Sequence, residues 1–198
     1  MQKHLASITK ILTEVGERVE GNFYCDISPN HIVADVNKIN NLRNVVAGRK
    51  KICEIGVNAC HSLLFMLDVN PDAEYALFDI GIHKYLEPCF NYLQDQFSNT
   101  KMSLFIGDSK ITVPAYAENN KNQFDCCHID GGHQPPEFTS DYENCIIMLK
   151  KGGLIIFDDY DYDEIRKFVD SKLASGEVIK VQHPSLSDLN CHIVLMKV

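Results

Sequence analysis

Residues 126 to 133 bring together side chains that can bind metals or transfer protons. This stretch reads CCHIDGGH, with two thiols, two imidazoles and one carboxylate within eight positions. It could be a metal-ligand cluster, a catalytic loop or the end of a buried strand. Side chains alternate faces along a strand, so Cys126 and His128 point to one side and Cys127 to the other. A zinc cluster is therefore disfavoured, and these three residues are expected to be buried.

The elements that position this stretch are short apolar segments separated by amphipathic helical patterns. Five such segments are expected to be strands: 51–56, 75–79, 103–108, 124–130 and 154–159. Strands that alternate with helices favour a parallel sheet covered on both faces. After a helix near 164–173, segments 178–182 and 191–197 follow in close succession. Because a parallel crossover needs a dozen or more residues, these two are expected to form an antiparallel hairpin.

The first fifty residues show a different pattern. Apolar residues from Leu5 to Val19 recur at steps of 3 and 4, which predicts a helix that Gly21-Asn22 stops. A second helix is expected from Ser28-Pro29 to Gly48. We therefore divide the chain into a helical N-terminal extension, residues 1–49, and a main domain, residues 50–198. The extension would either cover a pocket or form a homodimer contact.

Composition limits the classes of partner. The chain has 198 residues, 27 acidic against 19 basic, and a formal net charge of −8. A nucleic-acid binder normally has a basic face, so nucleic acid is not expected as a partner. The apolar runs are far shorter than the ~20 residues that cross a bilayer, so no membrane association is expected. Eight scattered cysteines and no secretory-signal pattern suggest reduced thiols and a cytoplasmic location.

Acidic residues lie at or near the ends of all five expected parallel strands. They are Glu54, Asp79, Asp108, Asp130, and the pair Asp158 and Asp159. Each position alone is an ordinary place for a helix cap or turn residue. However, ligands of open parallel sheets bind outside the carboxyl ends of the strands. A rim of carboxylates would repel a pyrophosphate but would suit a cationic cofactor, ribose hydroxyls and a divalent metal.

The loop after the first strand supports this choice of ligand. A dinucleotide-binding loop requires the spacing G-x-G-x-x-G, whereas residues 56–61 contain the single glycine Gly56. A cofactor carboxylate could still bind the helix N-terminus near His61 and Ser62. Asp79 lies 23 residues after Gly56 (79 − 56), close to the ~20 expected for an acid that binds ribose.

These residues resemble a known superfamily. Glu54-Ile55-Gly56, Asp79, Gly107-Asp108 and the terminal hairpin are similar to class I S-adenosylmethionine-dependent methyltransferases, over about residues 50–198. The resemblance implies a Rossmann-like α/β fold, with a seven-stranded, mostly parallel sheet, a C-terminal antiparallel hairpin and helices on both faces. Cys60 departs from the pattern, because it stands where a later glycine is usual. The resemblance implies cofactor contacts from Glu54, Gly56, Asn58, His61, Ser62, Asp79, Asp108 and Asp130.

A narrower resemblance involves a metal. HIDGGH at 128–133, Gly152-Gly153 and Asp158-Asp159-Tyr160 are similar to the metal-dependent O-methyltransferases of the catechol and macrolide-sugar types. The similarity implies that Asp130, Asp158 and Asp159 hold Mg²⁺ or another divalent cation. It also implies that Asp130 and His133 are catalytic, with His133 as the proton acceptor.

The sequence therefore predicts a Mg²⁺-assisted, S-adenosylmethionine-dependent O-methyltransferase. Its substrate would be a hydroxyl of a small molecule, with a sugar or glycan as the leading class. Two alternatives remain open. One is a metal-independent methyltransferase that acts on nitrogen or on protein. The other is a catalytically degenerate binding domain that has lost cofactor affinity through its altered first loop.

Overall fold

The computed structural model describes residues 1–20, 32–189 and 191–198, and it contains one seven-stranded sheet. The strands in chain order are β1 (Lys51–Ile55), β2 (Glu74–Asp79), β3 (Lys101–Ile106), β4 (Phe124–Ile129), β5 (Leu149–Asp158), β6 (Val178–Lys180) and β7 (His192–Lys197). Their order across the sheet is β3-β2-β1-β4-β5-β7-β6. The first five strands are parallel, and β7 pairs antiparallel with both β5 and β6. The expected mostly parallel sheet with a C-terminal hairpin is confirmed.

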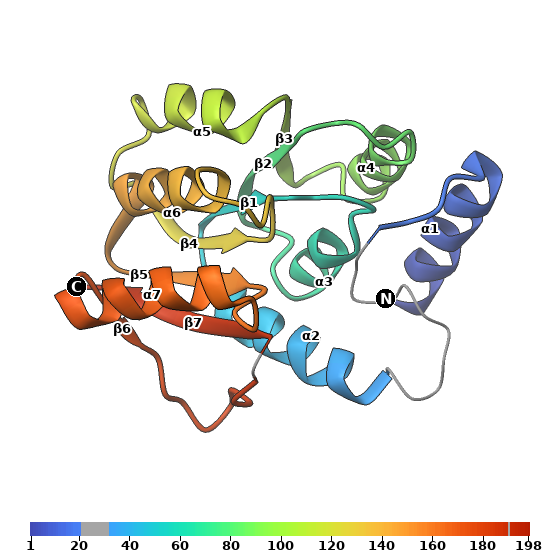
Figure 1. Ribbon diagram of the computed structural model, residues 1–198. Coiled ribbons are helices and arrows are strands. Elements are labelled where there is room, and N and C mark those ends of the chain that lie inside the picture. Colours follow the sequence, from blue (N-terminus) through green and yellow to red (C-terminus); the bar gives the residue numbers. More distant parts are fainter. Residues whose placement is uncertain (21–31, 190) are drawn as a thin grey trace.

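Helices cover both faces of the sheet (Figure 1). They are α1 (Gln2–Val15), α2 (Ile32–Val46), α3 (His61–Val69), α4 (Leu86–Gln96), α5 (Ser109–Ala117), α6 (Glu137–Met148) and α7 (Asp163–Ser175). One hydrophobic core lies between one face of the sheet and helices α1, α2, α3 and α4. A second core lies between the other face and helices α5, α6 and α7. The N-terminal extension thus shares a core with the main domain. None of the helices in the described ranges is long and apolar enough to span a membrane.

Several element boundaries differ from the sequence prediction. Helix α1 ends at Val15 rather than Val19, because Gly16 adopts a left-handed conformation (φ 69°) and its N–H bonds to Leu12. The stop predicted at Gly21-Asn22 and the start at Ser28-Pro29 lie outside the described residues. Strand β5 begins at Leu149, five residues before the expected start. Helix α5 has no counterpart in the sequence prediction, and it contains Pro114.

The buried strand interpretation of residues 126–129 is confirmed. Cys126 belongs to the core under α1 to α4, and Cys127 belongs to the core under α5 to α7. Both side chains are fully buried. They therefore lie on opposite faces of β4 and cannot bind one ion together.

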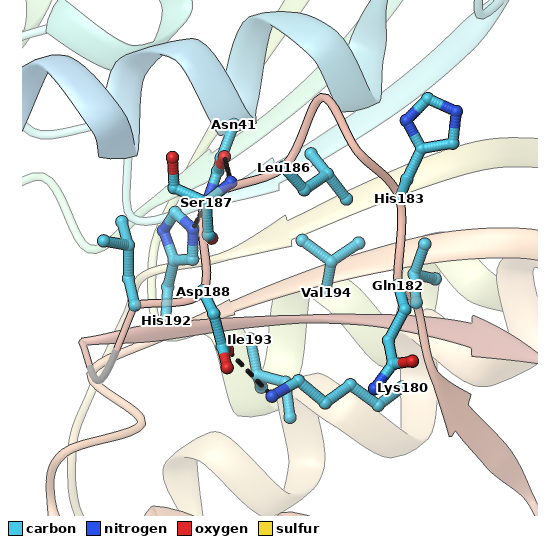
Figure 2. Close-up of a pocket in the computed structure, with 12 residues that line it drawn as sticks. Asn41, Lys180, Gln182, His183, Leu186, Ser187, Asp188, His192, Ile193 and Val194 are labelled. Atoms are coloured by element: carbon cyan, nitrogen blue, oxygen red, sulfur yellow. Dashed lines mark hydrogen bonds and ion pairs between the residues drawn. The ribbon is translucent and has the colours of Figure 1, made fainter.

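Polar contacts fix helix α2 against the start of β7 and the loop before it (Figure 2). The Asn41 side chain donates to the Ser187 carbonyl at 2.8 Å, lies 2.8 Å from His192 Nε2, and accepts the Ser187 N–H. A small cavity of about 260 Å³ lies between α2 and the loop that joins β6 to β7. Asn41 thus sets the position of α2 relative to β5 and β7.

Candidate active site

A cavity of about 600 Å³ opens at the carboxyl ends of β1, β2 and β4. This is the point where the strand order reverses, because β1 lies between β2 and β4. Five of the eight expected cofactor residues line it, namely Gly56, Asn58, Asp79, Asp108 and Asp130. His133 and Asp159 line it as well. The structure therefore brings most of the sequence-predicted residues to one cavity.

The other three expected cofactor residues lie beneath the cavity rather than on its wall. Glu54 is fully buried, and its Oε1 lies 3.0 Å from His128 Nδ1. His61 and Ser62 are buried in the first turn of α3. Burial lowers the pKa of His61 to about 4, so its ring is neutral at physiological pH.

Asp79 organises the loop that follows β1. Its Oδ2 accepts the N–H groups of Val57 and Asn58 at 2.9 and 2.8 Å, and its Oδ1 accepts the Gly81 N–H at 2.9 Å. Gly56 begins this loop with φ +87°. A Cβ at Gly56 would lie 1.9 Å from the Asp130 carbonyl oxygen. The loop therefore depends on a glycine at this position and on the Asp79 carboxylate.

Asp130 lines the cavity, and the buried Asp158 lies close to it without lining the cavity itself. A carboxylate oxygen of each lies within 4.8 Å of the other and of a His128 ring nitrogen. Asp158 Oδ1 accepts the Asp159 N–H at 3.0 Å, and Asp158 Oδ2 forms an ion pair with Lys38. Burial, followed by the Asp158 charge, raises the pKa of Asp130 well above its usual range. Two carboxylates this close need either a proton on one of them or a cation beside them.

Asp159 lies next to His133 and is not part of the Asp130–Asp158–His128 group. Asp159 Oδ2 lies 2.7 Å from His133 Nε2, and the left-handed backbone at Asp159 (φ 55°) separates its side chain from that of Asp158. The hydrogen bond with Asp159 raises the pKa of His133, although burial opposes the shift. The His133 and Tyr162 rings lie 4.9 Å apart. Asp159 therefore orients His133 in this structure.

Lys38 and His128 are the residues of this site that sequence reasoning missed. Lys38 comes from α2 and lines the cavity, and no motif in the sequence marks it. His128 was expected to be interior, and it is, but its proximity to Asp130 and Asp158 was not foreseen. Its position two residues before Asp130 on the same strand was the available signal, because residues i and i+2 share a face.

Asp141 of α6 lies next to Gly131, in the loop that follows β4. A Cβ at Gly131 would lie 3.2 Å from Asp141 Oδ2, and the Asp141 side chain is fully buried. Within the described residues neither of its oxygens has a hydrogen bond of ordinary geometry. Burial raises the pKa of Asp141 to about 6, against the lowering effect of the Ser109 hydroxyl.

This burial predicts a pH-dependent gain of stability in Asp141→Asn. The unfolded carboxyl titrates near 4 and the folded one about two units higher, so the wild type loses stability as pH rises between these values. The variant is expected to be about 1–3 kcal/mol more stable than the wild type at pH 8 and no more stable at pH 4. Thermal denaturation across this pH range measures the effect.

Asp125 provides a control of opposite sign. Despite burial, hydrogen bonds from Lys150 and from the Lys50 and Lys51 N–H groups lower the pKa of Asp125. The stability that the Asp125 carboxylate contributes is present above about pH 4. It is lost as pH falls through the lowered pKa of the folded state. Asp125→Asn should therefore lose stability at pH 8. Equal responses of the two variants would contradict the assignment.

Comparison with known proteins agrees with this geometry. Residues 53–160 match a family model described as a methyltransferase domain. A solved methyltransferase from Geobacter sulfurreducens has a TM-score of 0.63 at 11% identity, covering 99% of this chain and 88% of its own. A candidate O-methyltransferase from Klebsiella pneumoniae has a TM-score of 0.68 at 15% identity, covering 98% and 89%. No curated protein matches the chain by sequence. The two structural likenesses support the fold.

Proposed function

Because this chain belongs to the methyltransferase-domain family, we propose that it transfers a methyl group from S-adenosylmethionine to a hydroxyl of a small molecule. The observation that carries the proposal is one cavity lined by Gly56, Asp79, Asp130 and His133, with the buried Asp158 close to Asp130. A sugar or glycan is the leading acceptor class, and this choice rests on the HIDGGH and Asp158-Asp159-Tyr160 resemblance. The similar Klebsiella pneumoniae protein is described as a candidate O-methyltransferase, which supports oxygen as the acceptor atom.

The cavity suits S-adenosylmethionine in shape and charge. The close approach of Gly56 to the Asp130 backbone leaves no room for a side chain, so the loop stays thin where a cofactor would pass. Acidic side chains on the wall favour a cation: Glu20, Asp79, Asp108, Asp130, Glu137 and Asp159. The cofactor supplies an electrophilic methyl group on a positively charged sulfur. We propose that Asp79 and Asp108 accept hydrogen bonds from its polar groups.

The residues around Asp130 would prepare the acceptor hydroxyl. Asp130 and Asp158 offer converging oxygens, the ligand type that Mg²⁺ prefers, and we propose that they hold a divalent cation with Asp159 as the third carboxylate. Such an ion supplies charge that lowers the pKa of a neighbouring hydroxyl. His133 would take the hydroxyl proton, and Asp159 would hold the ring in place.

A metal-independent methyltransferase that acts on nitrogen or on protein is the second candidate. The observation that favours it is the ion pair between Lys38 and Asp158, which already gives that carboxylate a cation. In this case Asp158 would order the strand end, and no divalent ion would be needed for turnover.

The N-terminal extension, residues 1–49, would act as a cover for the site. Glu20 and Lys38 line the cavity, and Glu17 binds His83 at 2.8 Å at its edge. We therefore favour a role as a cap over a role as a homodimer contact. In the described residues, α1 and α2 pack onto the main domain. This packing leaves fewer apolar residues exposed for a partner subunit.

Mass spectrometry tests the proposed function directly. The chain is incubated with S-adenosylmethionine that carries a deuterated methyl group and with a panel of sugars and catechols, with Mg²⁺ or with EDTA. We expect one acceptor to gain one labelled methyl group in Mg²⁺, and we expect EDTA to abolish this transfer. Turnover that persists in EDTA would favour the metal-independent candidate. No transfer to any hydroxyl, despite cofactor binding, would contradict the O-methyltransferase proposal.

Removal of His133 should reduce turnover without unfolding the protein. His133→Ala is expected to lower kcat by about tenfold or more, because general-base catalysis contributes at least this much. The side chain is 43% exposed, so the free energy of unfolding should change little. His183→Ala is the matched control, because this exposed histidine lies in the loop after β6 and bonds to Ser185 there. Equal activity of both variants would remove His133 from the reaction.

A further inference from the structure

Lys38 of α2 lines the cavity and contacts a buried carboxylate. Lys38 Nζ forms an ion pair with Asp158 Oδ2, and the Asp158 side chain has no exposed surface. The Lys38 side chain is itself 19% exposed and lines the cavity. A buried carboxylate is costly without a cation beside it. Lys38 therefore supplies charge to the same carboxylate that a metal at Asp158 would use.

The position of Lys38 is fixed by the helix that carries it. Asn41 lies three residues later on the same face of α2 and binds His192 and Ser187 (Figure 2). His192 on β7 is the register partner of Asp158 on β5. The contacts of Lys38 and Asn41 with the sheet thus fall at one pair of residues, Asp158 and His192. The Asn41 contacts hold α2 at this place, and the Lys38 ammonium group meets Asp158 from the same helix.

A lysine and a divalent ion cannot occupy this place together. Asp130, Asp158 and His128 offer atoms within 4.8 Å of one another, a space for one cation. The ammonium group and a metal ion repel each other, and both would take the Asp158 carboxylate. The cavity beside Lys38, about 600 Å³ in volume, gives its side chain somewhere to move.

We propose that Lys38 is the resident cation of the Asp130–Asp158 pair in the metal-free protein, and that a divalent ion binds only by displacing it. The inference rests on the proposed function only for the place where the metal binds. It assigns Lys38 a regulatory role, since the ammonium group lowers the affinity of the site for metal. It also keeps the two carboxylates compensated when metal is scarce.

Titration with Mn²⁺ alone, followed by electron paramagnetic resonance, tests this exchange. The full chain is compared with Lys38→Met, which keeps the length of the side chain and removes its charge. The variant is expected to bind Mn²⁺ at least about tenfold more tightly, because no competitor must first leave. Addition of Asp158→Asn to Lys38→Met should abolish the gain. Lys10→Met, at a 77% exposed position on α1, should bind as the wild type does.

Thermal denaturation gives a second readout. In EDTA, Lys38→Met is expected to melt at a lower temperature than the wild type, and Mn²⁺ should restore the loss. Lys38→Met that binds Mn²⁺ no more tightly than the wild type, or that melts in EDTA as the wild type does, would overturn the inference. Binding by Lys38→Met but not by the wild type would support it, while removing the metal from the proposed function. Methyl transfer is measured separately, so a failure of the proposed function can be told apart from a failure of the Lys38 exchange.

Discussion

Gly56→Ala is expected to lower the free energy of unfolding by about 3 kcal/mol and to abolish cofactor binding. The new Cβ would lie 1.9 Å from the Asp130 carbonyl oxygen and 2.5 Å from its carbonyl carbon. Both atoms belong to backbone that cannot move freely, because the Asp130 N–H bonds to Ile55 at 2.8 Å. The φ of +87° adds a second cost for any side chain. Chemical denaturation measures the loss.

Gly152→Ala separates these two costs. Gly152 also has a positive φ (+75°), but a Cβ there would meet nothing within 4 Å. This variant should lose only about 1 kcal/mol, the cost of the backbone conformation alone. Equal stability of Gly56→Ala and Gly152→Ala would contradict the close contact between Gly56 and the Asp130 backbone.

Asp79→Ala is expected to weaken binding of S-adenosylhomocysteine by about a hundredfold. The change leaves the N–H groups of Val57, Asn58 and Gly81 without their carboxylate acceptor, and each such bond contributes about 1.5–3 kcal/mol. The expected loss corresponds to about 2.7 kcal/mol of binding free energy. It arises because the loop after β1 must then be ordered by the ligand itself.

Asp79→Asn is the matched variant for this position. An amide oxygen can still accept from Val57 and Asn58, so the loop should stay ordered and the affinity loss should be smaller. Isothermal titration of both variants gives the comparison. Alanine and asparagine variants that bind as tightly as the wild type would show that Asp79 does not support the cofactor loop.

Much of the site could be predicted from the sequence because parallel strands bring their carboxyl ends to one edge. Asp130 and Asp158 are 28 positions apart (158 − 130), yet β4 and β5 are neighbours and their ends converge. The reversal of strand order at β1 likewise places Gly56 next to Asp130. These relations follow from topology, which alternating strands and helices indicate.

The features that escaped prediction depend on side-chain packing between distant elements. Lys38 reaches Asp158 only because α2 packs against the start of β7, which pairs with the end of β5. Helical periodicity carries no information about that packing. The direction of Asp159 depends on one left-handed residue after β5. Asp79 was expected to bind ribose, whereas the structure shows its carboxylate bonded to three backbone N–H groups. Its contact with a cofactor stays a prediction.

Isothermal titration of S-adenosylhomocysteine into the wild-type chain tests the central claim most directly. The claim is that the cavity at the ends of β1, β2 and β4 holds the methyl donor. We predict one binding site per chain, which Gly152→Ala retains and Gly56→Ala loses. A wild-type chain that binds no nucleoside, or binding that Gly56→Ala leaves unchanged, would contradict the claim.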